Sequence, residues 1–129
     1  MSEHWQVQNL SMDPEREHDR WAATEHECGY IRARLRLLTT AQGGRHTPIY
    51  SGYRSHWAFP PGFRQEGHDA PLTLELTITL APGEEAMVRL HPIAPDLWPQ
   101  VAPGLRLSMF EGARLVGLAD VVEVVPPVP

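Results

Sequence analysis

A chain of 129 residues is long enough to bury a core of its own, so folding does not depend on a disulfide or a metal. Its formal charge of -5 resides in the first 30 residues, where seven acids outnumber two arginines; the rest is neutral, which excludes a globally basic nucleic-acid binder. Lysine is absent, so every basic residue is an arginine. A single cysteine cannot form an internal disulfide, and no apolar run approaches the roughly 20 residues needed to span a membrane. These features predict a cytoplasmic protein that does not span a membrane.

Residues 1–30 form an acidic N-terminal extension, in which one short helix is expected over 11–27. Asp13 suits the N-cap and Pro14 the first helical position, and acidic side chains in the opening turn complement the helix dipole. Gly29 is expected to end the helix. Because few of its side chains are apolar, we expect the helix to lie thinly on the rest of the domain or to be partly mobile.

From Ile31 onward the apolar period changes to two, which predicts strands. In the first strand Arg32, Arg34 and Arg36 share the exposed face, and over 72–80 leucine and isoleucine are expected inside with threonine and glutamate outside. Glycine and proline separate the segments and predict turns or irregular connections, including a polar one over 62–71. The expected strands are 31–37, 48–59, 72–80, 86–90, 104–110 and 114–125, of which the last two form a closing hairpin around 111–113.

Three motifs occur in an order that is specific to one family. They are GGRHTPIYSGYR at 43–54, LHPIA at 90–94, and GLRL at 104–107 followed by EGARLVG at 111–117. Together they resemble the C-terminal, third domain of translation elongation factor Tu, as a stand-alone copy without the GTPase domain. The resemblance implies an all-β fold, a six-stranded antiparallel β-barrel over 31–125, with a frayed tail at 126–129.

The resemblance also implies a surface that contacts the T stem of tRNA through sugar and phosphate rather than through bases. Its residues in this chain are Arg45, His46, His91, Glu111 and Gly112. A second set is expected to be structural, with glycines that supply turn conformations and an arginine that holds a loop through backbone carbonyls. This set comprises Gly43, Gly44, Gly52 and Arg54.

Catalytic signatures are missing from the sequence. A phosphate-binding loop of the usual kind needs a lysine, and Cys28 lies beside acids that raise a thiol pKa, so neither nucleotide binding nor thiol catalysis is expected. Seven histidines are scattered without the spacing of metal ligands. We therefore expect no catalytic residue, no metal site and no cofactor.

The function expected is that of a non-catalytic binding module, which docks a protein of the translation apparatus or acts as a domain mimic or regulator. Binding of tRNA or another structured RNA is the alternative, and a metal-dependent enzyme is a remote one. Protein is preferred because one barrel would neutralise only a few phosphates and the acidic extension would repel RNA. The oligomeric state and the partner stay open.

Overall fold

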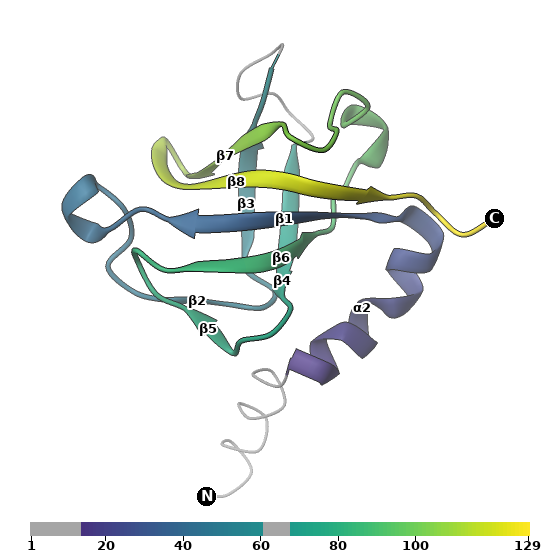
Figure 1. Ribbon diagram of the computed structural model, residues 1–129, viewed down its shortest axis with the longest axis horizontal. Helices are drawn as coiled ribbons and strands as arrows, with labels where there is room; N and C mark the ends of the chain where they lie inside the picture. The colour runs from purple at the N-terminus through teal and green to yellow at the C-terminus, as the bar shows by residue number, and fades with distance from the viewer. Residues whose placement is uncertain (1–13, 61–67) are drawn as a thin grey trace, which may run out of the picture.

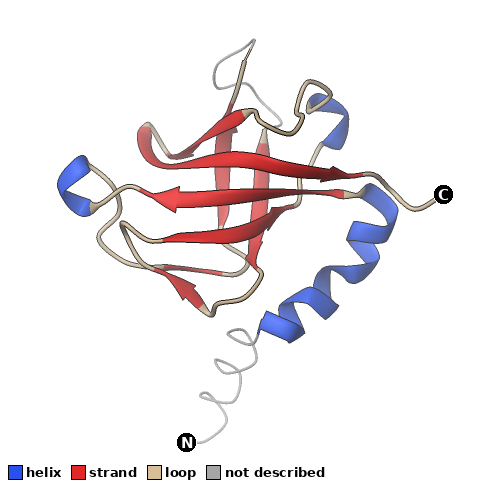
Figure 2. Ribbon diagram, in the orientation of Figure 1, coloured by secondary structure: helices blue, strands red, loops and turns tan. Residues whose placement is uncertain are grey.

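The computed structural model describes residues 14–60 and 68–129. Within these ranges one α-helix, α2 (Pro14–Cys28), lies against the outside of a β-structure (Figures 1 and 2). The helix ends where Gly29 takes a φ of 74° and its N–H donates to the carbonyl of Glu25 at 2.8 Å. The predicted end of the helix is therefore confirmed, whereas the predicted Asp13 cap lies outside the described residues.

The strands follow the helix in chain order, with two single-turn 3-10 helices between them. They are β1 (Tyr30–Leu37), η1 (Thr40–Gln42), β2 (Ile49–Tyr50), β3 (Arg54–Ala58), β4 (Asp69–Leu74), β5 (Thr79–Leu80), β6 (Glu85–Leu90), η2 (Pro95–Leu97), β7 (Arg106–Glu111) and β8 (Arg114–Val125).

Six of these strands close into an antiparallel barrel in the order β1-β6-β4-β3-β7-β8, and β2 pairs with β5 in a separate two-stranded sheet. The first and last strands are neighbours, from Tyr30 opposite Val125 to Leu37 opposite Gly117. The β7–β8 hairpin closes with Glu111 opposite Arg114. The expected six-stranded barrel with a short N-terminal helix is therefore confirmed.

The barrel interior is apolar because alternate residues of each strand point inward. In β1 the residues between the arginines are the buried ones, so the predicted alternation of this strand is confirmed. Phe59, His68 and Trp98 pack together in this core region, with ring centroids 4.3 Å apart for Phe59 and His68. The largest fully buried side chains are Trp57, Leu35, Leu37, Ile49, Leu72, Leu74, Leu80, Leu90, Leu107, Met109 and His68.

The predicted strand over 48–59 is wrong in its middle, where the chain reverses. Gly52 takes a φ of 95° and donates its N–H to the carbonyl of Leu72 at 2.7 Å, and the N–H of Tyr53 donates to the carbonyl of Tyr50 at 3.1 Å. Few residues other than glycine adopt this φ, so the turn separates β2 from β3.

The strand predicted over 72–80 is also wrong in part, because the alternation fails after Leu74. Leu76 is 91% exposed and Ile78 47%, whereas Glu75 is only 8% exposed. Two arginines bind the Glu75 carboxylate against the barrel wall, and the chain then leaves the barrel to form β5. At the other end β4 begins at Asp69, inside the segment predicted as a polar connection.

The C-terminal residues, predicted to be frayed, contact the helix. The N–H of Val128 donates to the carbonyl of His26 at 2.8 Å. A Cβ on Gly29 would lie 2.2 Å from the carbonyl oxygen of Val125, so this close approach of helix end and tail requires glycine. None of the helices in the described ranges is long and apolar enough to cross a membrane.

Candidate functional site

The GGRH turn is built by η1 and two glycines. Thr39 caps η1 by accepting from the N–H of Gln42, whose side chain accepts from the N–H of Thr39 in return, as in a capping box. Gly43 has a φ of 94°. Gly44 is buried, and a Cβ there would lie 2.5 Å from the carbonyl oxygen of Leu38. Both glycines therefore hold the positions that a turn requires.

Arg45 follows this turn and lies at the centre of a cluster formed by Arg45, Thr47, Tyr53 and Glu111, the Arg45 cluster. Its guanidinium forms an ion pair with the Glu111 carboxylate and donates to the Tyr53 hydroxyl at 3.1 Å. It also donates to the carbonyl and the hydroxyl of Thr47, at 3.2 and 3.0 Å, and lies 4.9 Å from the Tyr53 ring centroid. The arginine fork is thus occupied by groups of the protein itself.

The structure brings together four of the five residues that the resemblance implied for RNA. Glu111 meets Arg45 directly, Gly112 forms the adjacent hairpin turn, and His46 follows Arg45 in sequence. His46 and Gly112 are exposed, and Gly112 has open space at its Cβ position. Burial raises the pKa of Tyr53, so its hydroxyl remains a neutral donor to Glu111.

His91 is in a different environment from the other four, beneath α2. Its ring stacks on Trp21 with centroids 4.1 Å apart, and its Nε2 lies 3.3 Å from the Thr73 hydroxyl. The residue is 3% exposed. Burial, assisted by the nearby Arg89 guanidinium, lowers the pKa of His91 to about 4, so the ring is neutral near pH 7.

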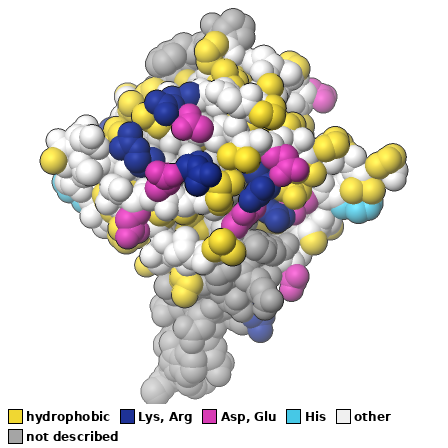
Figure 3. Space-filling view, viewed as in Figure 1, with side chains coloured by type: hydrophobic (Ala, Val, Ile, Leu, Met, Phe, Trp, Pro, Cys, Tyr) yellow, Lys and Arg dark blue, Asp and Glu magenta, His cyan; other side chains and the backbone are white. Residues whose placement is uncertain are grey.

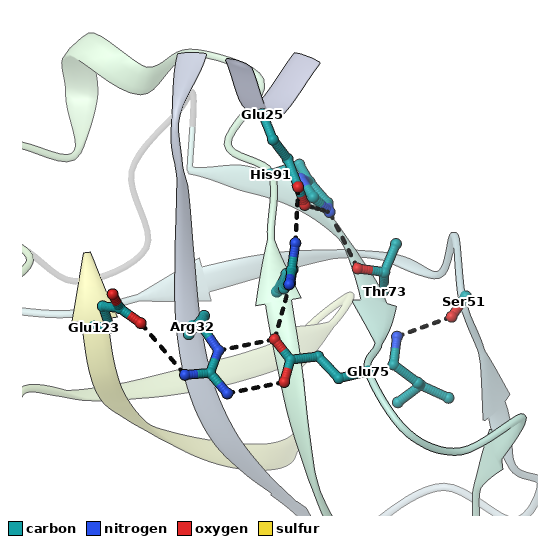
Figure 4. Close-up of polar contacts among 9 residues, drawn as sticks. Glu25, Arg32, Ser51, Thr73, Glu75, His91 and Glu123 are labelled. Carbon is teal, nitrogen blue, oxygen red and sulfur yellow. Dashed lines mark hydrogen bonds and ion pairs between the residues drawn. The ribbon is translucent and has the colours of Figure 1, made fainter. Parts of the chain in front are cut away.

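A row of alternating charges crosses the barrel wall beside His91. We call it the carboxylate–arginine ladder; its members are Glu25, Arg89, Glu75, Arg32 and Glu123. Arg89 donates to Glu25 at 2.8 Å and to Glu75 at 2.9 Å. Arg32 donates to both oxygens of Glu75, at 2.8 and 2.9 Å, and reaches Glu123 at 3.3 Å, as Figure 4 shows.

Glu75 is the electrostatic centre of this ladder. The hydrogen bond from Arg32 is the main cause that lowers the pKa of Glu75, to about 2, against the opposing effect of burial, and Arg89 adds to it. The same contact holds the pKa of Arg32 above its usual range. Both arginines therefore remain charged and bound to a carboxylate at any physiological pH.

The exposed strand face beside the ladder is balanced in the same way. Arg34 lies 3.6 Å from Glu85, and Arg106 binds Asp120 through two nitrogens at 2.8 and 3.1 Å. Figure 3 shows dark-blue and magenta side chains interspersed over the face that carries β8, β1 and β6. Two arginines of the predicted stripe of β1, Arg32 and Arg34, are therefore paired with carboxylates, whereas Arg36 is exposed to solvent.

Arg54, expected to hold a loop through backbone carbonyls, contacts a carboxylate instead. It lies 3.3 Å from Asp69, which also lies 2.9 Å from Nδ1 of His56. The hydrogen bond from His56 is the main cause that lowers the pKa of Asp69. Asp69 therefore orients the His56 ring. Acid–base catalysis by His56 would also need a reacting group within hydrogen-bond distance of that ring.

The described part of the chain contains no preformed metal-binding cluster. No group of three or more histidine, cysteine or acidic side chains there is arranged to hold an ion. Cys28 is an exposed thiol at the end of α2.

The sequence alone did not reveal the carboxylate–arginine ladder or the contact of Trp21 with His91. Glu75 fell on the outer face of a predicted strand, and Arg89 and Trp21 lie on other elements, so no local pattern joins them. The available signal was weak: a single glutamate among leucines, in a chain whose first strand carries three arginines on its outer face. None of the protein-family models compared with the chain matches it.

Proposed function

We propose that this protein is a non-catalytic, cytoplasmic binding module that docks a protein of the translation apparatus, as a mimic or regulator of the third domain of elongation factor Tu. Two observations support the proposal. The sequence motifs resemble that domain, and the chain folds as a closed six-stranded barrel. A shared barrel does not by itself carry an activity, so the choice of partner depends on the site.

The contacts of the Arg45 side chain favour a protein partner over RNA. Its side chain is only 15% exposed, and its donors are engaged by Glu111, Tyr53 and Thr47. To bind a phosphate, the guanidinium would have to leave a carboxylate that already satisfies it. His91, the second cationic candidate by resemblance, is neutral and covered by Trp21.

The surrounding surface supports the same choice. Binding to an RNA backbone depends on cations that release counterions from phosphates, and each contact contributes to a strong salt dependence. Four arginines of the ladder and of the adjacent strand face, Arg32, Arg89, Arg34 and Arg106, are paired with carboxylates. A mosaic of paired charges suits a protein partner, for which local complementarity matters more than net charge.

Cross-linking in the native host tests the proposal. The full chain, carrying a photo-cross-linking residue in place of His46, would be irradiated in cells and the adducts identified by mass spectrometry, with and without RNase treatment. We expect an adduct with one translation protein, which survives RNase and binds the purified chain with saturable affinity. Val122, an exposed residue of β8 that does not belong to the Arg45 cluster, serves as the control position.

Direct titration with tRNA tests the alternative. Purified full chain would be added to labelled tRNA at low salt, in wild-type form and as Arg45→Ala. Saturable binding that Arg45→Ala abolishes would replace protein docking by RNA binding. Absence of both a translation-protein adduct and tRNA binding would overturn the proposed function as a whole.

A further inference from the structure

Among the described residues, two side chains of helix α2 make the contacts with the barrel wall beneath it that matter here. Trp21 stacks on His91, and Glu25 binds Arg89 at 2.8 Å. The helix otherwise offers little to a core, because Ala22 and Ala23, the other apolar residues expected to pack, are exposed. Residues four apart on a helix share a face, so Trp21 and Glu25 form one short contact stripe.

The barrel surface beneath this stripe has the composition of a protein interface. We call it the helix-covered face and define it by Tyr30, Thr73, Arg89 and His91. Arg89 lies 4.6 Å from the Tyr30 ring centroid, and His91 presents its flat side to Trp21. Arginine and aromatic side chains are enriched at binding hot spots, whereas the barrel core is made of leucine and other apolar residues.

The helix-covered face keeps its charge balance without the helix. Arg32 and Arg89 are matched by Glu75 and Glu123, which all belong to the barrel wall. Departure of Glu25 therefore leaves no buried charge without a counter-charge, the situation that makes most buried pairs costly to open. Figure 4 shows Glu25 at one end of this network, next to His91, and Glu123 at the other end.

Docking of α2 on the barrel buries two polar atoms without a hydrogen bond. Trp21 Nε1 and His91 Nδ1 are buried without a hydrogen-bond partner among the described residues. A buried polar atom without a hydrogen-bond partner has lost its hydration without compensation, which disfavours the docked state. One residue, Gly29, joins the helix to β1, and the end of the helix also accepts a hydrogen bond from Val128 of the tail, so the helix lies outside the sheet.

We propose that the helix-covered face is a docking site for a partner helix that carries an aromatic residue and, four positions later, a carboxylate, and that α2 occupies this site in cis. The aromatic ring stacks on His91, and the carboxylate binds Arg89. The inference rests on the proposed function, because it names a partner class for a protein-docking barrel. The partner helix competes with α2 for one surface, so binding and release of α2 are coupled.

A peptide with the sequence of α2 is the probe, because its contacts are known. The full chain would be prepared as Trp21→Ala/Glu25→Gln, which weakens the cis helix, and titrated against fluorescein-labelled peptide 14–28 by anisotropy. We expect saturable binding to this variant and an affinity for wild type that is weaker on the order of 100-fold, because the tethered helix is present at a high effective concentration.

Matched controls isolate the stripe. A peptide with alanine and glutamine at the positions of Trp21 and Glu25 should not bind, and a full chain with Glu27→Gln, an exposed acid on α2, should behave as wild type. Circular dichroism and urea unfolding establish that each chain is folded. If the double variant does not fold, Glu25→Gln alone, which keeps the Trp21 stacking, is titrated instead.

The outcomes separate this inference from the function on which it rests. No peptide binding by a folded weakened variant would overturn the helix-docking site, and the cross-linking result would be unaffected. A gain of tRNA binding by that variant without peptide binding would also overturn it, since the helix would then cover an RNA surface. Equal peptide affinity of wild type and variant would contradict competition with α2.

Discussion

At the scale of single residues, Glu75 organises the charged wall of the barrel. Its side chain is 9% exposed and receives hydrogen bonds from Arg32 and Arg89, whose backbones are register partners on β1 and β6. Glu75→Gln would leave the two guanidinium groups as neighbours without their shared carboxylate. We expect the free energy of unfolding to fall by about 2 to 3 kcal/mol, less than for a fully buried pair because water reaches both arginines.

Urea unfolding followed by tryptophan fluorescence measures this change. Glu85→Gln is the matched control, since Glu85 is exposed and lies 3.6 Å from Arg34. An exposed pair of this kind should contribute less than about 1 kcal/mol. Equal unfolding midpoints for the two variants would contradict a central role for Glu75.

His91 makes stability depend on pH. The pKa of His91 is lowered from 6.5 to about 4 in the folded protein, so between these values the unfolded chain binds a proton that the folded protein does not. Stability therefore falls as the pH is lowered through this window, by about 3 kcal/mol at about 1.4 kcal/mol per pKa unit. Glu75 acts at lower pH, between 4.5 and about 2, where its carboxylate becomes protonated on unfolding.

Comparison of His91→Gln with wild type checks this window. The variant should be less stable at pH 7, but its stability should change less between pH 6.5 and 4 than that of wild type, which urea midpoints at several pH values would show. The same slope for both proteins would mean that another group titrates in this range.

At the scale of elements, Gly29 controls how α2 meets β1 and the tail. It combines a φ of 74° with a Cβ position 2.2 Å from the carbonyl oxygen of Val125. Gly29→Ala should therefore lower the free energy of unfolding by more than the roughly 1 kcal/mol expected from the φ strain alone. The additional loss arises because the backbone has to move to make room for the Cβ. Gly112→Ala, at a φ of 61° in open space, bears the strain without the collision.

Thermal unfolding and trypsin cleavage after Arg20, within α2, measure the two effects of Gly29→Ala. We expect a lower melting temperature than for Gly112→Ala and faster cleavage of the helix. If the two variants are equally stable and equally resistant to trypsin, the contact of the helix end with the tail contributes nothing.

At the scale of the whole molecule, stability should be uneven. Strands β1 and β8 pair over their lengths in the closed barrel, whereas β2 and β5 pair through two residues each and α2 is held by its contact stripe. Regions with few buried contacts open without global unfolding. Hydrogen exchange should therefore protect β1 amides most, and α2 amides exchanging as slowly would contradict an exchangeable helix.

Local pattern determined much of this protein. The period of two in β1, the closing hairpin and the glycine that ends α2 are local features, and they predicted strands, turns and the helix boundary. The resemblance to the third domain of elongation factor Tu predicted that the strands close into a six-stranded barrel. Alternation and turn conformation depend on residues that are neighbours in sequence, so they can be inferred from the sequence alone. The resemblance implied that Arg45 and the last hairpin belong to one surface, and in the structure Arg45 forms an ion pair with Glu111 of that hairpin.

The contacts of the charged and aromatic side chains follow from the three-dimensional fold and not from local pattern. Arg45 and Glu111 form an ion pair, His91 lies under Trp21, and the alternation over 72–80 fails at Glu75. Each outcome depends on groups that are distant in sequence and meet across the barrel, where a counter-charge or burial outweighs the local preference for solvent. The sequence pattern and the resemblance together predicted the barrel, and contacts formed on folding determine which of its cations are paired within the protein.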